Sequence, residues 1–405
     1  MVVLPGGPPF PPPVWSVGED RDTLKKRKER SIVGREGLHG DAVPAGSAGK
    51  AWLPGGREMI EIDGSHGEGG GQILRTALSL SCLSGKPFRM VNIRKGRKKP
   101  GLAPQHLVCV RAAREISGAQ VSGDRQGSVE LVFSPGKVKG GDFSFDVGTA
   151  GSTLLVLQSI VPALLFPRGK STVTVRGGTH VPFSPPFHYA AYVLVPVLGR
   201  LGVELSLSIG SYGFYPRGGG EIRSEIFPSE GIRPLGLPER GKIHAVTGWS
   251  AAGNLPLSIA RRQRDAAIEA LRSRLRGADF PVDIGILPVQ TPGQGTFLFL
   301  LVEAEKGIAG FSSLGERGKR AEIVGEEAAA ALAAYCETGA ALDPHLPDQL
   351  ALYLAMCREG SVFTTSRVTE HLVTNLWTIG LFREFRFSVE GEVGKPGTVR
   401  IGPNV

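Results

Sequence analysis

The sequence of 405 residues predicts an α/β (α+β) protein in which three repeated βαβαββ units form a large domain, with a small α/β domain inserted between the second and third units. Two observations predict this architecture. One order of elements, a helix, a strand, a second helix and two strands, recurs along the chain. One stretch between the second and third copies breaks that order. The three units are expected to pack sheet against helix around shared cores.

The first two copies each begin where an apolar strand enters a turn that contains glycine, and their elements follow from the spacing of apolar residues. In the first copy the predicted elements are a helix 72–83, a strand 89–94, a helix 103–116, and strands 120–123 and 128–133. In the second copy they are a strand 145–147, a helix 152–166, a strand 171–176, a helix 186–201, and strands 203–209 and 220–227.

The third copy is less clear at its start. Its predicted elements are a helix 346–357, a strand 361–365, a helix 368–379, and strands 385–390 and 398–401. The inserted stretch before it reads as a strand 242–248, a charged amphipathic helix 256–275, and strands 281–287 and 295–303. A further helix, 322–336, is expected to rejoin the large domain. The arginines of the charged helix either contact nucleic acid or form a solvated helix face.

Residues 1–58 differ in composition from the rest of the chain. Pro-rich and Gly-rich pieces surround a charged cluster at 25–30 without sustained periodicity, so this segment is predicted to be a disordered extension or the result of a start codon assigned too far upstream. Met59 stands immediately before the first strand. The predicted domains are residues 59–236 for the first two units, 237–318 for the insertion, and 319–405 for the third unit.

Composition and charge narrow the class of protein. With 41% hydrophobic and 21% charged residues and no apolar run of membrane length, the chain is expected to be soluble and to have no membrane partner. Four cysteines without a CxxC pair favour a reducing, cytoplasmic location and no structural zinc. The basic cluster is a candidate nuclear address if the leading segment is real and the source is eukaryotic. Of the net charge of +9, only +2 lies in residues 1–58, where nine Lys/Arg face seven Asp/Glu, and the excess favours an anionic partner.

The stretch from Glu61 to Arg75 (EIDGSHGEGGGQILR) carries the strongest functional signal. A short strand enters a glycine-rich turn, which lets the backbone approach a bound group, and a helix then opens with its free N–H groups and positive dipole end toward the same place. Glu68 in this turn is a candidate ligand for a divalent metal. The pattern fits neither GxGxxG nor the P-loop, and the remaining alternative is a tight turn without a ligand.

Two further segments contain candidate binding residues. The loop in 93–106 (IRKGRKKPGLAPQH) places five basic residues ahead of a helix that opens near Gln105, which suits a polyphosphate or an RNA backbone but also fits a solubilising loop. The segment 343–349 (DPHLPDQ) starts a helix with Asp348 and Gln349 in its first turn. Helix capping alone would explain Asp348.

His371 lies near the start of the last predicted helix, within TEHLVTN. An oxygen of Glu370, Thr374 or Asn375 could orient its ring and leave the other ring nitrogen free, and a neutral imidazole is a competent nucleophile at pH 7. A purely structural histidine remains the alternative on these residues alone.

Six blocks in one order resemble the RNA 3′-terminal phosphate cyclase family over nearly all of 59–401: EIDGSHGEGGGQILRTALSLS, IRKGRKKPGLAPQHL, AGSTLLVLQ, GFYPRGGGE, HLPDQL and EHLVTN. The resemblance implies the fold inferred above and a ligase-type enzyme that consumes ATP. Such an enzyme converts an RNA 3′-phosphate to a 2′,3′-cyclic phosphodiester and releases AMP and diphosphate. The implied route passes through a covalent histidyl-AMP and then an RNA adenylate.

The same resemblance assigns residues to roles. His371 matches the nucleophile, and Glu68 matches the carboxylate that binds Mg²⁺ or Mn²⁺. The residues that match phosphate contacts are Arg75, Arg94, Arg97 and Gln105. Those that match the adenosine-binding positions are Gln158, His345, Leu346, Pro347, Asp348 and Gln349. This chain has His345 and Pro347 where relatives usually have Tyr or another residue before LADQ.

Two other classes of protein remain as alternatives. One is a non-catalytic cyclase-like factor in ribosome assembly, which keeps the fold but lacks the nucleophile and much of the phosphate site. The other is an enolpyruvyl transferase built from the same repeated units, which needs no TEHLVTN block. Because His371, Glu68 and the Arg94/Arg97 loop are all present, the sequence favours the enzyme, with ATP and an RNA 3′-phosphate end as its partners.

Overall fold

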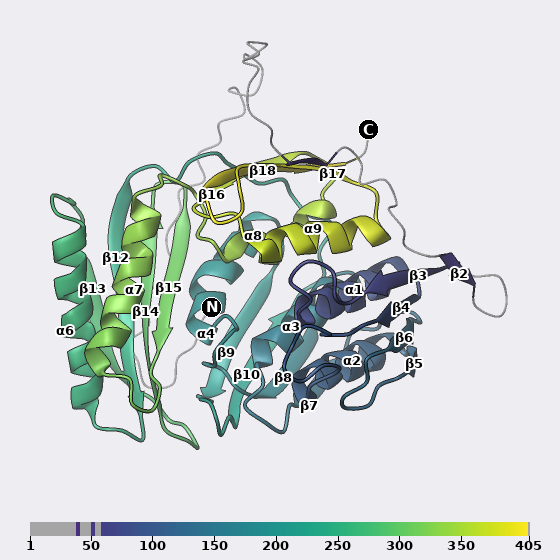
Figure 1. The fold of residues 1–405 in the computed structure, drawn as a ribbon, viewed down its shortest axis with the longest axis horizontal. Helices are drawn as coiled ribbons and strands as arrows, with labels where there is room; N and C mark the ends of the chain where they lie inside the picture. The colour runs from purple at the N-terminus through teal and green to yellow at the C-terminus, as the bar shows by residue number, and fades with distance from the viewer. Residues whose placement is uncertain (1–37, 41–49, 53–57, 404–405) are drawn as a thin grey trace, which may run out of the picture.

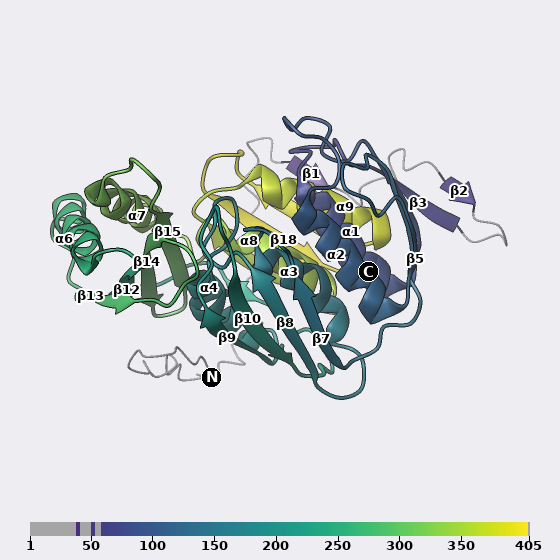
Figure 2. The same ribbon diagram turned by 90° about the horizontal axis from the view of Figure 1, so that it is seen from below.

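Four β-sheets and their helices make up the part of the chain that the computed structural model describes, residues 38–40, 50–52 and 58–403 (Figure 1). Three sheets surround a common group of helices, and the fourth lies to one side with two helices of its own (Figure 2). The chain is therefore a mixed α/β protein, as the sequence predicts. None of the helices in these ranges combines the length and apolar character needed to cross a membrane.

The first sheet has the strand order β2-β3-β4-β6-β5 and contains the strand that leads into the glycine-rich turn. β3 and β4 are parallel, and β6 and β5 are antiparallel to their neighbours. The chain between these strands forms two helices, α1 and α2. Gly85 follows α1 and Gly118 follows α2, and each has the left-handed conformation that glycine adopts readily. The elements are β2 (Lys50–Trp52), β3 (Glu58–Asp63), α1 (Gly71–Ser84), β4 (Phe88–Val91), α2 (Pro104–Ser117), β5 (Gln120–Ser122) and β6 (Leu131–Ser134).

The second sheet has the order β7-β8-β10-β9. Where the sequence predicts one helix over 186–201, the structure has a π-helical turn in the middle. Pro196 explains the break, because it has no N–H to donate to the carbonyl one turn earlier. The elements are β7 (Asp142–Asp146), α3 (Thr153–Leu164), β8 (Ser171–Gly177), α4 (Phe187–Tyr189), η2 (Ala190–Leu194), α5 (Val195–Arg200), β9 (Leu205–Ser211) and β10 (Gly220–Ile226).

The third sheet has the order β1-β17-β18-β16-β11. Its helices α8 and α9 pack against each other on one side of it (Figure 1). Thr369 caps α9, since its hydroxyl accepts a hydrogen bond from the backbone N–H of Leu372 at 3.1 Å. The elements are β1 (Leu38–Gly40), β11 (Gly236–Leu237), α8 (Leu346–Ala355), β16 (Ser361–Thr365), α9 (Glu370–Phe382), β17 (Arg386–Glu390) and β18 (Gly397–Gly402).

These three sheets share one arrangement of their main strands. In the orders β3-β4-β6-β5, β7-β8-β10-β9 and β11-β16-β18-β17, the first two strands are parallel and the remaining neighbours are antiparallel. The inserted sheet separates β11 from α8, which explains why the third copy is hard to recognise at its start. That the three sheets derive from one repeated unit stays a prediction, as do the domain boundaries.

The fourth sheet has the order β13-β12-β14-β15 and carries α6 and α7. The helix expected at 322–336 to rejoin the large domain packs here instead, because its apolar face joins the core of this sheet through Val324, Ala328 and Leu332. The sequence analysis also missed β15. The elements are β12 (Ile243–Gly253), α6 (Leu257–Arg274), β13 (Val282–Pro288), β14 (Gly295–Ala304), β15 (Ile308–Leu314) and α7 (Ala321–Cys336).

The expected disordered or mis-assigned segment 1–58 lies mostly outside the described residues. Within it the structure describes β1, which pairs with β17, and β2, which pairs with β3.

Packing of helices from all three surrounding sheets positions the candidate site. α1 contacts α2, α3 and α9, and α8 contacts α9 and α3, within one continuous apolar core. Thr76 on α1 donates a hydrogen bond of 2.7 Å to Asn375 on α9. The start of α1, with its glycine-rich turn, therefore lies against the first turn of α9.

Candidate active site

The glycine-rich turn between β3 and α1 is shaped by close contacts as well as by backbone angles. Gly67 and Gly69 have left-handed φ angles of +55° and +59°. A Cβ at Gly67 would overlap the hydroxyl of Thr374, and a Cβ at Gly71 would overlap the ring of His106. Burial and two nearby arginines lower the pKa of His106 to about 3, so this supporting ring stays neutral. The turn therefore needs glycine in order to pack against α9 and α2.

The start of α1 has free donors. Gly70 occupies the N-cap position and provides no side-chain cap. The backbone N–H groups of Gly70, Gly71 and Gln72 donate no hydrogen bond to any other described residue. Unsatisfied N–H groups and the positive end of the helix dipole at one place form an anion-binding position.

His371 lies in the first turn of α9 with its ring held by Gln72 of α1. Nδ1 is 2.5 Å from the side-chain oxygen of Gln72. The side-chain nitrogen of Gln72 donates to Asp348 Oδ2 and to the carbonyl of His371, both at 3.2 Å, which fixes the orientation of the amide. Because the Gln72 oxygen can only accept, Nδ1 carries the proton and Nε2 keeps a free lone pair.

The prediction that Glu370, Thr374 or Asn375 orients the ring is thus corrected. Thr374 lies at the glycine-rich turn, 3.5 Å from the backbone nitrogen of Glu68, and Asn375 bonds Thr76 and the carbonyl of Asp348. These side chains leave α9 on the face that packs against α1 and α8. They hold the helix in place instead of contacting the ring.

Glu68 lies directly opposite the free nitrogen of His371. Its Oε2 is 2.9 Å from His371 Nε2, yet this oxygen is buried and accepts no hydrogen bond from a described residue. Its Oε1 accepts a bond of 2.8 Å from Arg97. Burial lowers the pKa of His371, with Arg75 and Arg97 acting in the same direction and Glu68 opposing them. The imidazole is therefore neutral at neutral pH, and its Nε2 lies 2.9 Å from the Glu68 carboxylate.

The three predicted arginines differ in how they are held. Arg75, half-buried on α1, forms no ion pair with any described residue, and burial lowers its pKa. Arg97 is exposed and paired with Glu68. Arg94 is engaged within its own loop, since it donates to the carbonyls of Lys99 at 3.1 Å and Gly101 at 2.8 Å. The geometry thus brings Arg75 and Arg97 to the histidine, while Arg94 braces the loop.

Gln105 stands apart from His371 and faces the second glycine-containing turn. Its side-chain oxygen accepts a bond of 3.2 Å from the backbone N–H of Ser152, the N-cap of α3. No hydrogen bond among the described residues links it to the histidine, so the predicted phosphate contact of Gln105 is not apparent from the protein geometry alone.

The predicted adenosine-binding residues join α3 to α8. Gln158 donates to the side-chain oxygen of Gln349 at 2.7 Å, and Gln349 donates to the carbonyl of His345 at 2.8 Å. An apolar hollow beside Gln158 is lined by residues such as Leu157 and Tyr353. His345 is exposed, whereas the side chains of Leu346 and Pro347 are buried. Those two residues therefore offer a ligand their backbone only.

Asp348 does not cap α8. Its carboxylate accepts from Gln72, and burial raises its pKa to about 7 although Arg75 acts in the opposite direction. The sequence analysis missed Gln72, whose position directly after three glycines was the available signal. It also missed Asp343, which is fully buried and accepts from the backbone N–H groups of His345 and Leu346 and from the hydroxyl of Tyr189.

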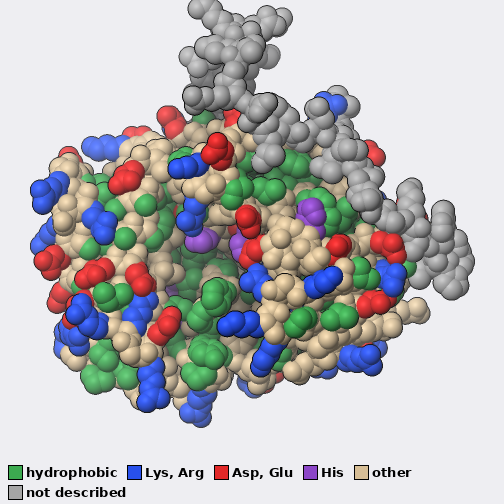
Figure 3. Space-filling model, viewed as in Figure 1, with side chains coloured by type: hydrophobic (Ala, Val, Ile, Leu, Met, Phe, Trp, Pro, Cys, Tyr) green, Lys and Arg blue, Asp and Glu red, His purple; other side chains and the backbone are tan. Residues whose placement is uncertain are grey.

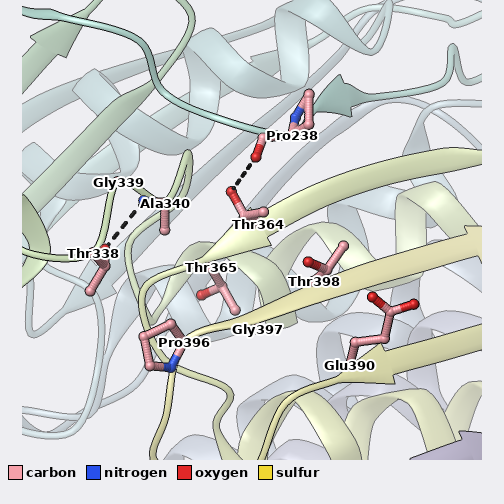
Figure 4. A pocket seen from close by; sticks show the side chains of 10 residues that line it. All are labelled: Pro238, Thr338, Gly339, Ala340, Thr364, Thr365, Glu390, Pro396, Gly397 and Thr398. Carbon is pink, nitrogen blue, oxygen red and sulfur yellow. Dashed lines mark hydrogen bonds between the residues drawn. The ribbon is translucent and has the colours of Figure 1, made fainter. Parts of the chain in front are cut away.

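The site differs from the hollow shown in Figure 4, which has a volume of about 350 Å³. That hollow lies between the turn at Thr338 and strands β16, β17 and β18, and its lining includes Thr364, Thr398 and Glu390. It contains none of the predicted site residues. The histidine site instead lies at the starts of α1 and α9. The contacts of His371 with Gln72 and Glu68 identify it, and not the volume of a cavity.

Comparisons with known proteins show that the chain is similar to one family of proteins. Residues 66–389 match the model of the family described as RNA 3′-terminal phosphate cyclase. Relatives with that name include proteins of Methylococcus capsulatus (45% identical over 356 residues, 85% of this chain and 97% of the relative) and Methanopyrus kandleri (43% over 349 residues, 85% and 99%). A third, from Thermococcus kodakarensis, is 44% identical over 348 residues, which is 86% of this chain and 99% of the relative.

Proposed function

The chain belongs to the RNA 3′-terminal phosphate cyclase family, and we propose from this premise that it converts an RNA 3′-terminal phosphate to a 2′,3′-cyclic phosphodiester while consuming ATP. The observation that carries the proposal is the arrangement of His371 between Gln72 and Glu68. Gln72 holds one ring nitrogen with its proton, and the other ring nitrogen faces the Glu68 carboxylate beside the start of α1, where a phosphate would bind.

In the first step, His371 Nε2 attacks the α-phosphorus of ATP. A phosphorus–nitrogen bond forms, the bond from the α-phosphorus to the bridging oxygen breaks, and diphosphate leaves. The ring gains positive charge as this bond forms. The Gln72 oxygen accepts a hydrogen bond from the Nδ1–H group, which stabilises that charge while the proton stays on the ring.

In the second step, an oxygen of the RNA 3′-phosphate attacks the same phosphorus and displaces the histidine, whose lone pair is restored. In the third step, the neighbouring 2′-hydroxyl attacks the 3′-phosphate, loses its proton and expels AMP. The free N–H groups at the start of α1, together with Arg75 and Arg97, are suited to hold the phosphates through these transfers. Gln158, Asp348, Gln349 and the backbone of 345–347 would hold the adenosine.

The residues present fit a divalent cation bound together with the nucleotide. Glu68 Oε2 is a buried carboxylate oxygen that accepts no hydrogen bond within the described part of the chain, although His371 Nε2 lies 2.9 Å from it. The described residues contain no group of three or more His, Cys, Asp and Glu side chains placed to hold a metal by themselves. One carboxylate plus substrate phosphates is a common way to bind Mg²⁺. Bound Mg²⁺ or Mn²⁺ would offset the negative charge that develops on the polyphosphate.

A labelling experiment tests the proposal. Incubation with ATP labelled at the α-phosphate and with Mg²⁺ is expected to leave label on the protein through an acid-labile, alkali-stable bond. An RNA with a 3′-phosphate should then release the label as AMP and acquire a cyclic end. His371→Ala should not be labelled, while His244→Ala, at an exposed position on β12, should be labelled as the wild type is. Equal labelling of wild type and His371→Ala would refute the mechanism, and no labelling at all would favour the non-catalytic cyclase-like factor.

A further inference from the structure

An exposed aromatic stack lies beside the candidate site. The rings of His66 and Trp377 are 3.7 Å apart between centroids and tilted by only 14°. His66 belongs to the glycine-rich turn two residues before Glu68, and Trp377 lies on α9 after His371. Trp377 is half-buried and packs against the core, whereas His66 is exposed. The tryptophan therefore supports one face of the imidazole and leaves the other face toward solvent.

A loop with three exposed lysines adjoins the same turn. Lys95, Lys98 and Lys99 are exposed and form no ion pair with any described carboxylate. The loop is tied to the turn at two points, because Asn92 donates to Asp63 at 3.2 Å and Arg97 pairs with Glu68. The bonds of Arg94 to the loop carbonyls brace it from inside.

The arginine-rich helix α6 has a different character. Arg262 pairs with Glu322 at 2.7 Å and Arg264 pairs with Asp265 at 2.8 Å. In Figure 3 the Lys and Arg side chains over the left part of the face, where α6 and α7 lie in Figure 1, are interspersed with Asp and Glu. Two of its arginines are thus paired with carboxylates, whereas Lys95, Lys98 and Lys99 of the loop pair with no described carboxylate and lie next to the turn that carries Glu68.

We propose that the His66–Trp377 stack and Lys95, Lys98 and Lys99 bind the single-stranded RNA immediately upstream of its 3′ end. This inference rests on the proposed function and extends it from the terminal phosphate to the rest of the substrate. Lysines along a backbone track and an aromatic face for a nucleobase are the combination that binds single-stranded nucleic acid with little sequence preference. Both features flank the turn that carries Glu68, so a strand whose end reaches His371 passes them.

The lysines are tested by direct binding. A fluorescent RNA of about twelve nucleotides with a 3′-phosphate is titrated with wild type, Lys95→Ala/Lys98→Ala and the control Lys137→Ala/Lys139→Ala. The control pair is exposed near the other end of α2, where the backbone of Lys139 bonds Ile116. The first variant should bind about tenfold more weakly, and the slope of log K against log salt should decrease by about 1.4, roughly 0.7 per lost phosphate contact. The control should match wild type.

The stack is tested with variants of His66 that leave the lysines of the loop unchanged. His66→Ala should weaken binding of the same RNA about tenfold through loss of a stacking surface, while His66→Phe should retain it. A nucleoside 3′-phosphate, which has no upstream nucleotide, should compete equally well against wild type and all of these variants. Self-labelling with ATP in the absence of RNA reports the proposed function separately.

The outcomes distinguish the two claims. Weaker RNA binding by the lysine and His66→Ala variants supports the RNA track whether or not the protein labels itself with ATP. Unchanged RNA binding in both variants overturns it, even if self-labelling is normal. An equal loss of affinity for the nucleoside 3′-phosphate also overturns it, because the loop would then act on the terminal phosphate alone.

Discussion

Two strand-to-helix turns lie at corresponding positions of the first and second sheets: residues 64–70 between β3 and α1, and residues 147–152 between β7 and α3. Both are rich in glycine. In the second turn the backbone donors are satisfied by the protein itself, since Asp146, Thr149 and Gln105 accept from Gly148, Gly151 and Ser152, respectively. The hydroxyl of Ser152 then caps α3.

The first turn is left open at the equivalent place. Gly70 stands where Ser152 stands in the second turn, and α1 begins without a side-chain cap. Beside it lie Glu68, whose Oε2 accepts no hydrogen bond from the described residues, and Arg75, which forms no ion pair with any of them. The comparison teaches that a glycine-rich junction is not a binding site by itself. The first turn is a candidate site because the described residues give few partners to its backbone N–H groups and to Arg75.

The largest expected difference between the two turns is in the effect of replacing a glycine by alanine. Gly67 and Gly148 both have left-handed φ angles, +55° and +67°, but a Cβ would overlap Thr374 at Gly67 and meets nothing within 4 Å at Gly148. Both alanine variants should lose about 1 kcal/mol of stability from backbone strain. Gly67→Ala should also lose about 100-fold in self-labelling rate, because Glu68 and the backbone N–H groups at the start of α1 move relative to His371.

The rate of labelling from ATP and the free energy of unfolding in urea measure these two effects. Gly148→Ala is the matched control and should label within a few-fold of wild type. If Gly148→Ala loses as much labelling as Gly67→Ala, the second turn takes part in the chemistry and the contrast between the turns fails.

Gln72 gives the next largest effect, because it connects the start of α1 to His371. Gln72→Met keeps the length of the side chain but removes both hydrogen-bonding groups, so the tautomer and orientation of His371 are no longer fixed. The self-labelling rate should fall roughly 10- to 100-fold, as is typical when a group that orients a functional side chain is removed. The KM for ATP should change much less, since Gln72 acts through the histidine.

The control is Gln120→Met, at an exposed position on β5. A uniform rise in the KM for ATP with an unchanged rate at saturation would mean that Gln72 only binds the nucleotide, and would contradict its positioning role.

Much of the fold could be predicted because local signals and packing agree. The strand predicted at 361–365 is β16, and the helix predicted from residue 346 is α8. β11 and β15 were missed for physical reasons. β11 has two residues, and the strands of the fourth sheet separate it in sequence from its neighbour β16. β15 (IAGFSSL) consists largely of small residues, and its pairing with β14 along its whole length makes it a strand.

In the site, too, residues that belong to local motifs could be predicted, whereas a contact between residues far apart in the sequence could not. His371, Glu68 and Arg97, which the sequence singles out, lie together. The residue that orients the histidine could not be found from spacing, because Gln72 is 299 positions away in sequence. The prediction that helix α7 rejoins the large domain was wrong for a similar reason. Its sequence shows an apolar face, but only its contacts show that this face packs on the fourth sheet.

Asp348 is expected to have a smaller effect, on the pH dependence of the free energy of unfolding. Its folded-state pKa of about 7 lies above the ordinary value near 4, so the folded protein binds this proton more tightly than the unfolded chain. The free energy of unfolding therefore contains a contribution that falls as pH rises from about 4 to about 7 and is constant above. Asp348→Asn removes this contribution. The variant should gain at least about 1 kcal/mol relative to wild type between pH 4 and pH 8, since one pKa unit is roughly 1.4 kcal/mol.

Urea unfolding at several pH values measures the effect on Asp348. Asp142→Asn, at an exposed position on β7, is the control and should leave the pH dependence as it is in wild type. If wild type and Asp348→Asn show parallel pH profiles, the carboxyl is not protonated in this range, and the contact with Gln72 must be treated as one with a carboxylate throughout.

The smallest effect concerns the closed turn alone. Ser152→Ala removes the cap of α3 and should reduce the free energy of unfolding by about 1 kcal/mol, the usual effect of losing a serine N-cap. The backbone N–H of Ser152 still donates to Gln105, so the turn keeps its path. Self-labelling should therefore remain near the wild-type rate. A loss of labelling comparable to that of Gln72→Met, with stability unchanged, would show that the second turn acts on the nucleotide through Ser152, and that the two turns differ less in function than their hydrogen bonds indicate.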